Sequence, residues 1–196
     1  MVKKMNFKEK IKSVLTLRRL NALIVILIFV FLIQHALLSV LYLYNFIDYS
    51  PDFKIAGRRL FWLVLMHIIV SLYLFYKDHR KRKKINLYRD IITETHQQII
   101  TGIFIVLFAS LHVVSYSLYS LETSFGFSIS LVHFIIDNLL FISLLLHLRV
   151  SIPRLLVSLG FLVEKDSYRK VKKIVNILVV LIFLILLLAE IMFYLF

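Results

Sequence analysis

The stretch NALIVILIFVFLIQHALLSVLYLYNFI, residues 21–47, holds the two features on which the prediction of the fold depends. It is apolar and long enough to cross a hydrocarbon core of about 30 Å, which needs about 20 residues of helix. It has no small-residue cleavage site and is longer than a signal peptide, so we expect a true membrane span. It also carries a histidine, His35, inside the apolar run.

Similar apolar runs follow along the chain. Hydrophobic residues make up 61% of the 196 residues, with a mean hydropathy of +0.89, which is more than a water-soluble domain can bury. The predicted spans are 21–47, 60–76, 98–121, 126–148 and 174–195. We therefore predict an all-α membrane protein, with residues 1–196 forming a single integral membrane domain built as a five-transmembrane-helix bundle. Because the chain has no cysteine, thiolate chemistry, disulfides and cysteine-ligated iron–sulfur clusters are excluded within it.

The net charge of +13 is concentrated in three segments. The arm up to Arg19, the loop 77–94 and the segment 149–173 each carry seven Lys or Arg, and only Lys54, Arg58 and Arg59 lie elsewhere. The positive-inside rule therefore predicts a multi-pass protein of the bacterial cytoplasmic membrane, with the N-terminus in the cytoplasm and the C-terminus outside. We expect the basic segments to contact anionic lipid and to dock a cytoplasmic partner, and not to bind nucleic acid.

Five of the seven histidines fall inside the predicted spans, namely His35, His67, His112, His133 and His147. Ionisable residues in a membrane are costly and usually mark a pathway, a relay or a ligand site. Counted along the helices from the basic flanks, His67 and His147 lie toward the cytoplasm, and His35 and His112 lie farther out. Two pairs on facing helices, each at a common depth, predict bis-histidine ligation of two stacked haems.

His133 and Asp137 complicate this prediction. His133 precedes His147 by 14 residues, so both face the same side of the fourth span, and His133 is an alternative ligand for the outer haem. It could instead contact quinone or be a hydrogen-bonded core histidine. Asp137 follows His133 by four residues on the same face. The two could orient a ligand, relay a proton, contact quinone or form a purely structural pair.

The histidine-bearing segments resemble a known family. The segments are FVFLIQHALLSV, LVLMHIIVSLYLFYKDHRKRKKI, ITGIFIVLFASLH and LLLHLRVSIPRLLVSLG. They resemble the ligand helices of the five-helix dihaem cytochrome b, the membrane subunit of succinate:quinone oxidoreductases, and most closely the fumarate reductase type. The resemblance implies an inner haem b held by His67 and His147 and an outer haem b held by His35 and His112.

The resemblance also suggests roles for two further residues. Arg154 would pair with a haem propionate, since its planar fork matches a carboxylate. The alternative for Arg154 is a residue that snorkels to the membrane interface. Gly102 would let the porphyrin edge approach its helix, although a small residue also permits close helix packing.

The chain departs from the family at positions linked to proton transfer. The family has a glutamate two residues before its fourth ligand, where this chain has Leu145. The acids nearest to the family's quinone-site glutamate are Asp48 and Asp52, after the first span. Together with His133 and Asp137, they are the predicted quinone or proton-transfer residues, because quinone reduction needs a titratable group beside the ring.

The resemblance implies a membrane anchor that transfers electrons. Electrons would pass between cytoplasmic flavoprotein and iron–sulfur subunits and membrane menaquinone through the two haems, and a dimer of complexes fits the family. Dicarboxylate chemistry would belong to the partner subunits, so we predict no catalytic residue for it in this chain. Two alternatives stay open: a dihaem cytochrome b of another quinone-linked oxidoreductase or transmembrane reductase, and a haem-free transporter or assembly factor with a histidine proton relay.

Overall fold

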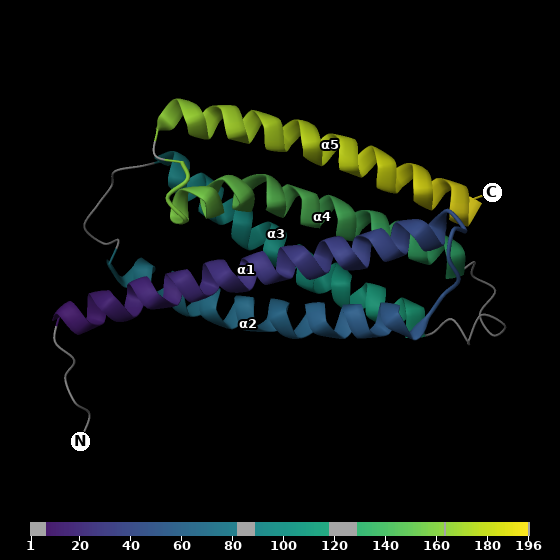
Figure 1. The fold of residues 1–196 in the computed structure, drawn as a ribbon, viewed down its shortest axis with the longest axis horizontal. Helices are drawn as coiled ribbons and strands as arrows, with labels where there is room; N and C mark the ends of the chain where they lie inside the picture. Colours follow the sequence, from purple (N-terminus) through teal and green to yellow (C-terminus); the bar gives the residue numbers. More distant parts are fainter. Residues whose placement is uncertain (1–6, 82–88, 118–128, 163, 196) are drawn as a thin grey trace, which may run out of the picture. The chain divides into compact units, whose positions relative to one another are not determined.

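The computed structural model is helical throughout the main elements that it describes, and it describes residues 7–81, 89–117, 129–162 and 164–195. The helices are α1 (Phe7–Leu43), α2 (Pro51–Lys81), α3 (Arg89–Ser117), α4 (Ile129–Ser158) and α5 (Lys165–Leu195) (Figure 1). Each contains a segment long and apolar enough to cross a membrane: Leu17–Leu43, Pro51–Lys77, Glu94–Ser115, Leu131–Ser158 and Asp166–Tyr194. The predicted all-α class with five membrane spans is therefore confirmed for the described residues.

The surfaces of these helices are apolar, whereas several polar side chains are buried. Trp62, Ile69 and Val113 are 61%, 60% and 62% exposed. By contrast, the side chains buried in the structure include Ser115, His133, Asp137, Ser143 and Glu190. Exposed apolar faces of this extent are unfavourable in water and match a lipid solvent. These buried polar side chains are therefore the candidate functional residues.

The first compact unit, Met1–Leu87, contains α1 and α2. They run alongside each other in opposite directions (Figure 1). Helix α1 ends in a Schellman motif around Asn45, whose φ is 57°: its N–H donates to the carbonyl of Tyr42 at 2.9 Å, and the Phe46 N–H donates to that of Leu41 at 2.9 Å. The predicted first span, 21–47, therefore extends past the end of the helix.

Helix α2 begins eight residues after the last residue of α1, and its first turn is well capped. The Ser50 hydroxyl oxygen accepts the Asp52 N–H at 3.3 Å, and Pro51 occupies the first helical position, where no N–H is needed. The tight connection of α1 to α2 fixes them as an antiparallel pair.

The second compact unit, Tyr88–Phe196, contains α3, α4 and α5. Helix α4 packs against both others. It continues through Pro153 to Ser158, and Gly160, whose φ is 83°, forms its C-terminal cap. The Gly160 N–H donates to the carbonyl of Val157 at 3.1 Å and the Phe161 N–H to that of Leu156 at 3.0 Å, again a Schellman motif.

Helix α4 therefore runs ten residues beyond the predicted boundary at 148, because the sequence analysis ended the span at the first charge, Arg149. The expected ends of two predicted spans, 118–121 and 126–128, lie outside the described residues.

In each unit the basic segments gather at one end, which we call the basic end. In the first unit it holds the start of α1 and the end of α2, since the two helices are antiparallel. In the second unit it holds the starts of α3 and α5 and the end of α4, as contacts of Glu94 with Lys172 and of Arg154 with Thr95 require. This arrangement agrees with the charge pattern, while the side of the membrane on which the basic ends lie stays a prediction.

Candidate functional site

In the first unit, His67 of α2 is hydrogen-bonded to α1 near the basic end. Its Nδ1 lies 3.0 Å from Oδ1 of Asn21, and the Ser71 hydroxyl lies 3.4 Å from the same oxygen. An amide oxygen only accepts hydrogen bonds, so Nδ1 carries the proton. In a neutral imidazole, Nε2 then keeps the lone pair that a metal ligand needs.

His35 of α1 lies at the other end of this unit. Its Nδ1 is buried, and its ring faces Gly57 of α2: a Cβ atom at Gly57 would lie 3.9 Å from the ring's Cε1. Asn21 and His35 are 14 residues apart on α1, which is a rise of about 21 Å. The first unit therefore holds one histidine near its basic end and one far from it.

In the second unit, His147 of α4 is hydrogen-bonded to α3 near the basic end. Its Nδ1 lies 3.1 Å from Oγ1 of Thr101. The Thr101 hydroxyl donates its proton to the carbonyl of Gln97 at 2.7 Å, so its oxygen accepts from Nδ1–H. The next residue, Gly102, faces the same ring, because a Cβ atom there would lie 3.7 Å from Cε1 of His147.

His112 of α3 is paired with a carboxylate on α4. Its Nδ1 lies 2.6 Å from Oδ1 of Asp137, whose side chain is 3% exposed. From the sequence, His133 on the same helix was a candidate partner of Asp137. This short contact joins Asp137 to His112 on α3. A hydrogen bond to an ionised acceptor is shorter and stronger than one between neutral groups.

Two further ionisable side chains are buried around this pair. His133 and Glu190 are each 1% exposed, and the ring of His133 meets that of Tyr194 edge-on at 6.2 Å between centroids. The carboxyl group of Glu190, on α5, is close enough to that of Asp137 to interact with it electrostatically. Glu190 was not predicted from the sequence, although an acid inside the apolar run 174–195 is a usable signal.

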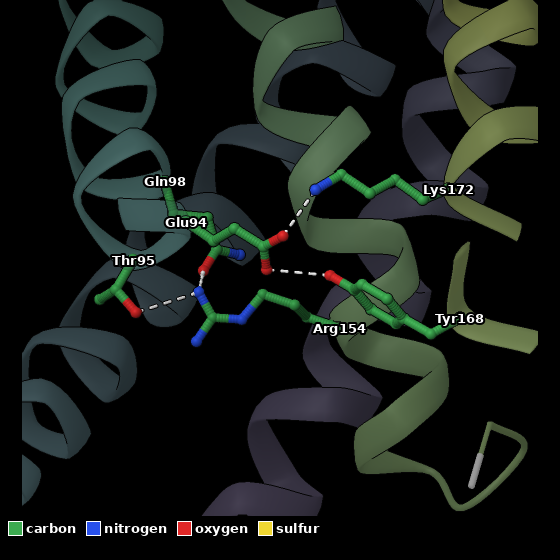
Figure 2. Close-up of polar contacts among 6 residues, drawn as sticks. All are labelled: Glu94, Thr95, Gln98, Arg154, Tyr168 and Lys172. Atoms are coloured by element: carbon green, nitrogen blue, oxygen red, sulfur yellow. Dashed lines mark hydrogen bonds and ion pairs between the residues drawn. The ribbon is translucent and has the colours of Figure 1, made fainter. Parts of the chain in front are cut away.

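Arg154 lies at the basic end of the second unit, where it joins α4 to α3 (Figure 2). Its Nη1 donates to Oε1 of Gln98 at 2.6 Å and to Oγ1 of Thr95 at 3.2 Å. Gln98 in turn donates to the Ser151 hydroxyl at 2.8 Å. The oxygens of Gln98 and Thr95 therefore fix the orientation of the guanidinium group. Its pairing with a haem propionate stays a prediction.

Beside Arg154, the carboxylate of Glu94 joins α3 to α5 (Figure 2). It accepts hydrogen bonds from Lys172 at 2.7 Å and from the Tyr168 hydroxyl at 2.9 Å. Neither Glu94 nor Tyr168 was predicted from the sequence as a site residue, since they lie near the starts of two different helices and are 74 positions apart in the chain.

The remaining predicted residues, Asp48 and Asp52, are exposed at the connection of α1 to α2. An aromatic cluster lies at the same connection: the rings of Tyr49 and Phe53 stack at 5.2 Å, and Tyr42 meets both edge-on. Aromatic residues are typical of a membrane interface. The place fits a headgroup-level site, and the quinone or proton role of both acids stays a prediction.

The second unit has the same arrangement as the first, over a shorter distance. Thr101 and His112 are 11 residues apart on α3, and Asp137 and His147 are 10 apart on α4, so the two contacts are separated by about 15 Å. Each unit thus carries one of the predicted ligands near its basic end and one far from it, in agreement with the depth count. The two histidines of each predicted haem pair belong to different units, and the pairing itself stays a prediction.

The imidazoles predicted as ligands suit a metal complex that already carries most of its own ligands. No cluster of three or more His, Asp or Glu side chains among the described residues could hold a bare metal ion. A porphyrin supplies four nitrogens and needs only axial ligands from protein, for which imidazole is well suited. Comparison with protein-family models, with curated proteins and with solved structures found no match.

Proposed function

We propose that this chain is the dihaem cytochrome b membrane subunit of an oxidoreductase of the succinate dehydrogenase and fumarate reductase type. The observation that carries the proposal is the state of Nδ1 in the predicted ligands. In His67, His112 and His147 this nitrogen is bound to an oxygen on a neighbouring helix. Metal-bound histidines almost always donate their other ring N–H in this way, because the bond fixes the tautomer and the ring orientation.

The residues that would hold the two haems follow from their levels. His67 and His147, nearer the basic ends, would ligate the inner haem b, and His35 and His112 would ligate the outer one. When bound, a haem of this type carries one electron at a time. Arg154 would neutralise a propionate, and Gly102 would leave room beside His147 for the porphyrin edge.

The rest of the chain fits an anchor in a larger complex. The basic ends would dock the flavoprotein and iron–sulfur subunits, which would perform the dicarboxylate chemistry in the cytoplasm. The far ends would carry the menaquinone site, where Asp48 and Asp52 or the buried His133 and Asp137 would exchange protons with the quinone. Electrons would then cross between these two sides.

The test is the haem content of the purified full-length chain, expressed with haem available, together with a reduced-minus-oxidised spectrum. We expect two low-spin b haems per chain. His→Ala changes at the four ligands should each remove one haem selectively, so that changes at 67 and 147 affect the same spectral band. His96→Ala is the matched control, since that histidine is exposed and outside the ligand set. A chain that stays colourless would contradict the proposal.

A second candidate function is a haem-free proton relay. It is favoured by the buried ionisable groups of the second unit, where Asp137 contacts His112 and Glu190 lies close by. The same measurement separates the two candidates, because a relay needs no haem. If the chain is colourless, changes at Asp137 and Glu190 should abolish proton uptake by vesicles that contain it.

A further inference from the structure

The hydrogen-bond partners of the three histidines differ in charge. His67 is bound to an amide oxygen at 3.0 Å and His147 to a hydroxyl oxygen at 3.1 Å. His112 is bound to a carboxylate oxygen at 2.6 Å. Thus only one of these three contacts is charge-assisted, and it involves the histidine assigned to the outer haem.

The carboxylate in this contact is buried between helices. The side chain of Asp137 is 3% exposed, and that of His112 is 29% exposed. Electrostatic interactions in such a low-dielectric setting are stronger than in water. A buried carboxylate also needs a hydrogen-bond donor, because an unpaired charge is costly there. The hydrogen bond from His112 Nδ1–H to Asp137 is therefore strongly favoured.

Such a bond changes the ligand itself. A carboxylate that accepts the Nδ1–H draws the proton away from the ring, and Nε2 becomes a more basic ligand. A more basic axial ligand stabilises the more positive, oxidised iron, and hydrogen bonding to ligands is one of the ways in which proteins set haem potentials. Neutral partners such as Thr101 and Asn21 have a smaller effect.

We infer, on the basis of the proposed function, that Asp137 is a positioning residue that lowers the reduction potential of the haem held by His112. The inner haem, whose ligands have neutral partners, is the acceptor of higher potential. The chain thereby sets an energy difference between its two haems through one side chain of α4.

The experiment is a redox titration of both haem bands in the purified full-length protein. His112→Ala first identifies the outer band by its loss. In Asp137→Asn, which keeps the size and removes the charge, we expect the oxidised-to-reduced equilibrium of that band to shift about tenfold toward the reduced form. This corresponds to about 59 mV upward for a one-electron step. The inner band should stay in place.

Two further variants complete the design. Ser143→Ala is the matched control, because Ser143 is buried on the same helix and its hydroxyl donates only to that helix's own carbonyl of Leu139. It should move neither band. Asp137→Glu keeps a carboxylate and should restore the midpoint toward the wild-type value.

The outcomes separate this inference from the proposed function. A wild-type chain without haem would contradict the proposed function and, with it, this inference. Two intact haems whose midpoints are unchanged in Asp137→Asn, or shifted equally, would overturn the inference alone. If Asp137→Asn loses the outer haem or both haems, Asp137→Glu decides: two haems with wild-type midpoints support the inference, and their loss overturns it.

Discussion

A histidine within a membrane span must satisfy two ring nitrogens without water. For one of these nitrogens, Nδ1, His67 uses Asn21 on the neighbouring helix and His147 uses Thr101. Each bond therefore orients a ring and also joins two helices. The partner residues are short and polar, so they hold the ring at a fixed distance from the helix. At this scale, ring orientation and helix association come from the same side chains.

Removal of one partner should weaken one haem more than the other. In Asn21→Leu, His67 loses the nearest acceptor of its Nδ1–H, since the Ser71 hydroxyl lies farther away at 3.4 Å, and we expect haem at that site to bind about 10–100-fold more weakly, as with other ligand-supporting residues. Haem retention during dilution in detergent would measure this. The matched control is Asn138→Leu, since that amide donates to the carbonyl of Phe134 on its own helix. Equal retention in Asn21→Leu and wild type would show that the Asn21 contact does not support a ligand.

At the scale of the element, helix ends and helix contacts follow from a few backbone requirements. Gly160 ends α4 with a φ of 83°, a conformation that L side chains rarely adopt. Gly102 is different, since it lies inside α3 and a Cβ atom there would make an ordinary van der Waals contact with His147 at 3.7 Å. The first glycine is required by the backbone, whereas nothing in the haem-free packing requires the second.

This difference predicts opposite results for two alanine substitutions. Gly160→Ala should lower the free energy of unfolding by about 1 kcal/mol, because the residue has a positive φ, while haem content per folded chain stays the same. Gly102→Ala should keep the thermal stability of the haem-free chain and lower its inner-haem content. Thermal unfolding in detergent and haem spectra would measure both effects. Normal haem content in Gly102→Ala would remove the proposed role of Gly102.

The link from α3 to α5 gives another prediction. Glu94→Gln removes the carboxylate that binds Lys172 at 2.7 Å in a partly buried site, and the loss of a charged hydrogen bond there should cost about 1–3 kcal/mol. Asp166→Asn is the matched control, since the contact of Asp166 with Arg169 is longer, at 3.8 Å, and exposed. An exposed pair of this kind contributes about 0–1 kcal/mol. Equal melting temperatures for the two variants would contradict this ranking.

The sequence predicted much of the fold because its apolar runs are long and its charges are clustered. The five spans and the two levels of histidines could be read from local counts along the chain. The contacts of Asp137 with His112 and of Arg154 with Gln98 could not, since each joins residues on different helices. A helical period places residues on a face, but it does not say which neighbouring helix that face meets.

At the scale of the whole chain, the membrane acts as the solvent that makes this distribution of residues possible. Apolar outer faces are unfavourable in water and favourable in lipid. Ionisable groups cost less when they are buried between helices than when they face lipid. Charge is the main feature that distinguishes the two ends of each unit, because the basic ends hold most of the Lys and Arg. Orientation in the membrane should therefore depend on these segments more than on any packed contact.

The absence of cysteine makes this orientation directly measurable. Single cysteines at Lys54, near the start of α2, and at Lys170, near the start of α5, introduce one thiol each into an otherwise unreactive chain. Both positions are exposed and lie within four residues of the end of a candidate span, so the labelling difference should report the side of the membrane. In intact cells, a membrane-impermeant maleimide should label Lys54→Cys and leave Lys170→Cys unlabelled until the membrane is opened. The reverse pattern would place the basic ends outside, and the proposed cytoplasmic partners would then have no access to them.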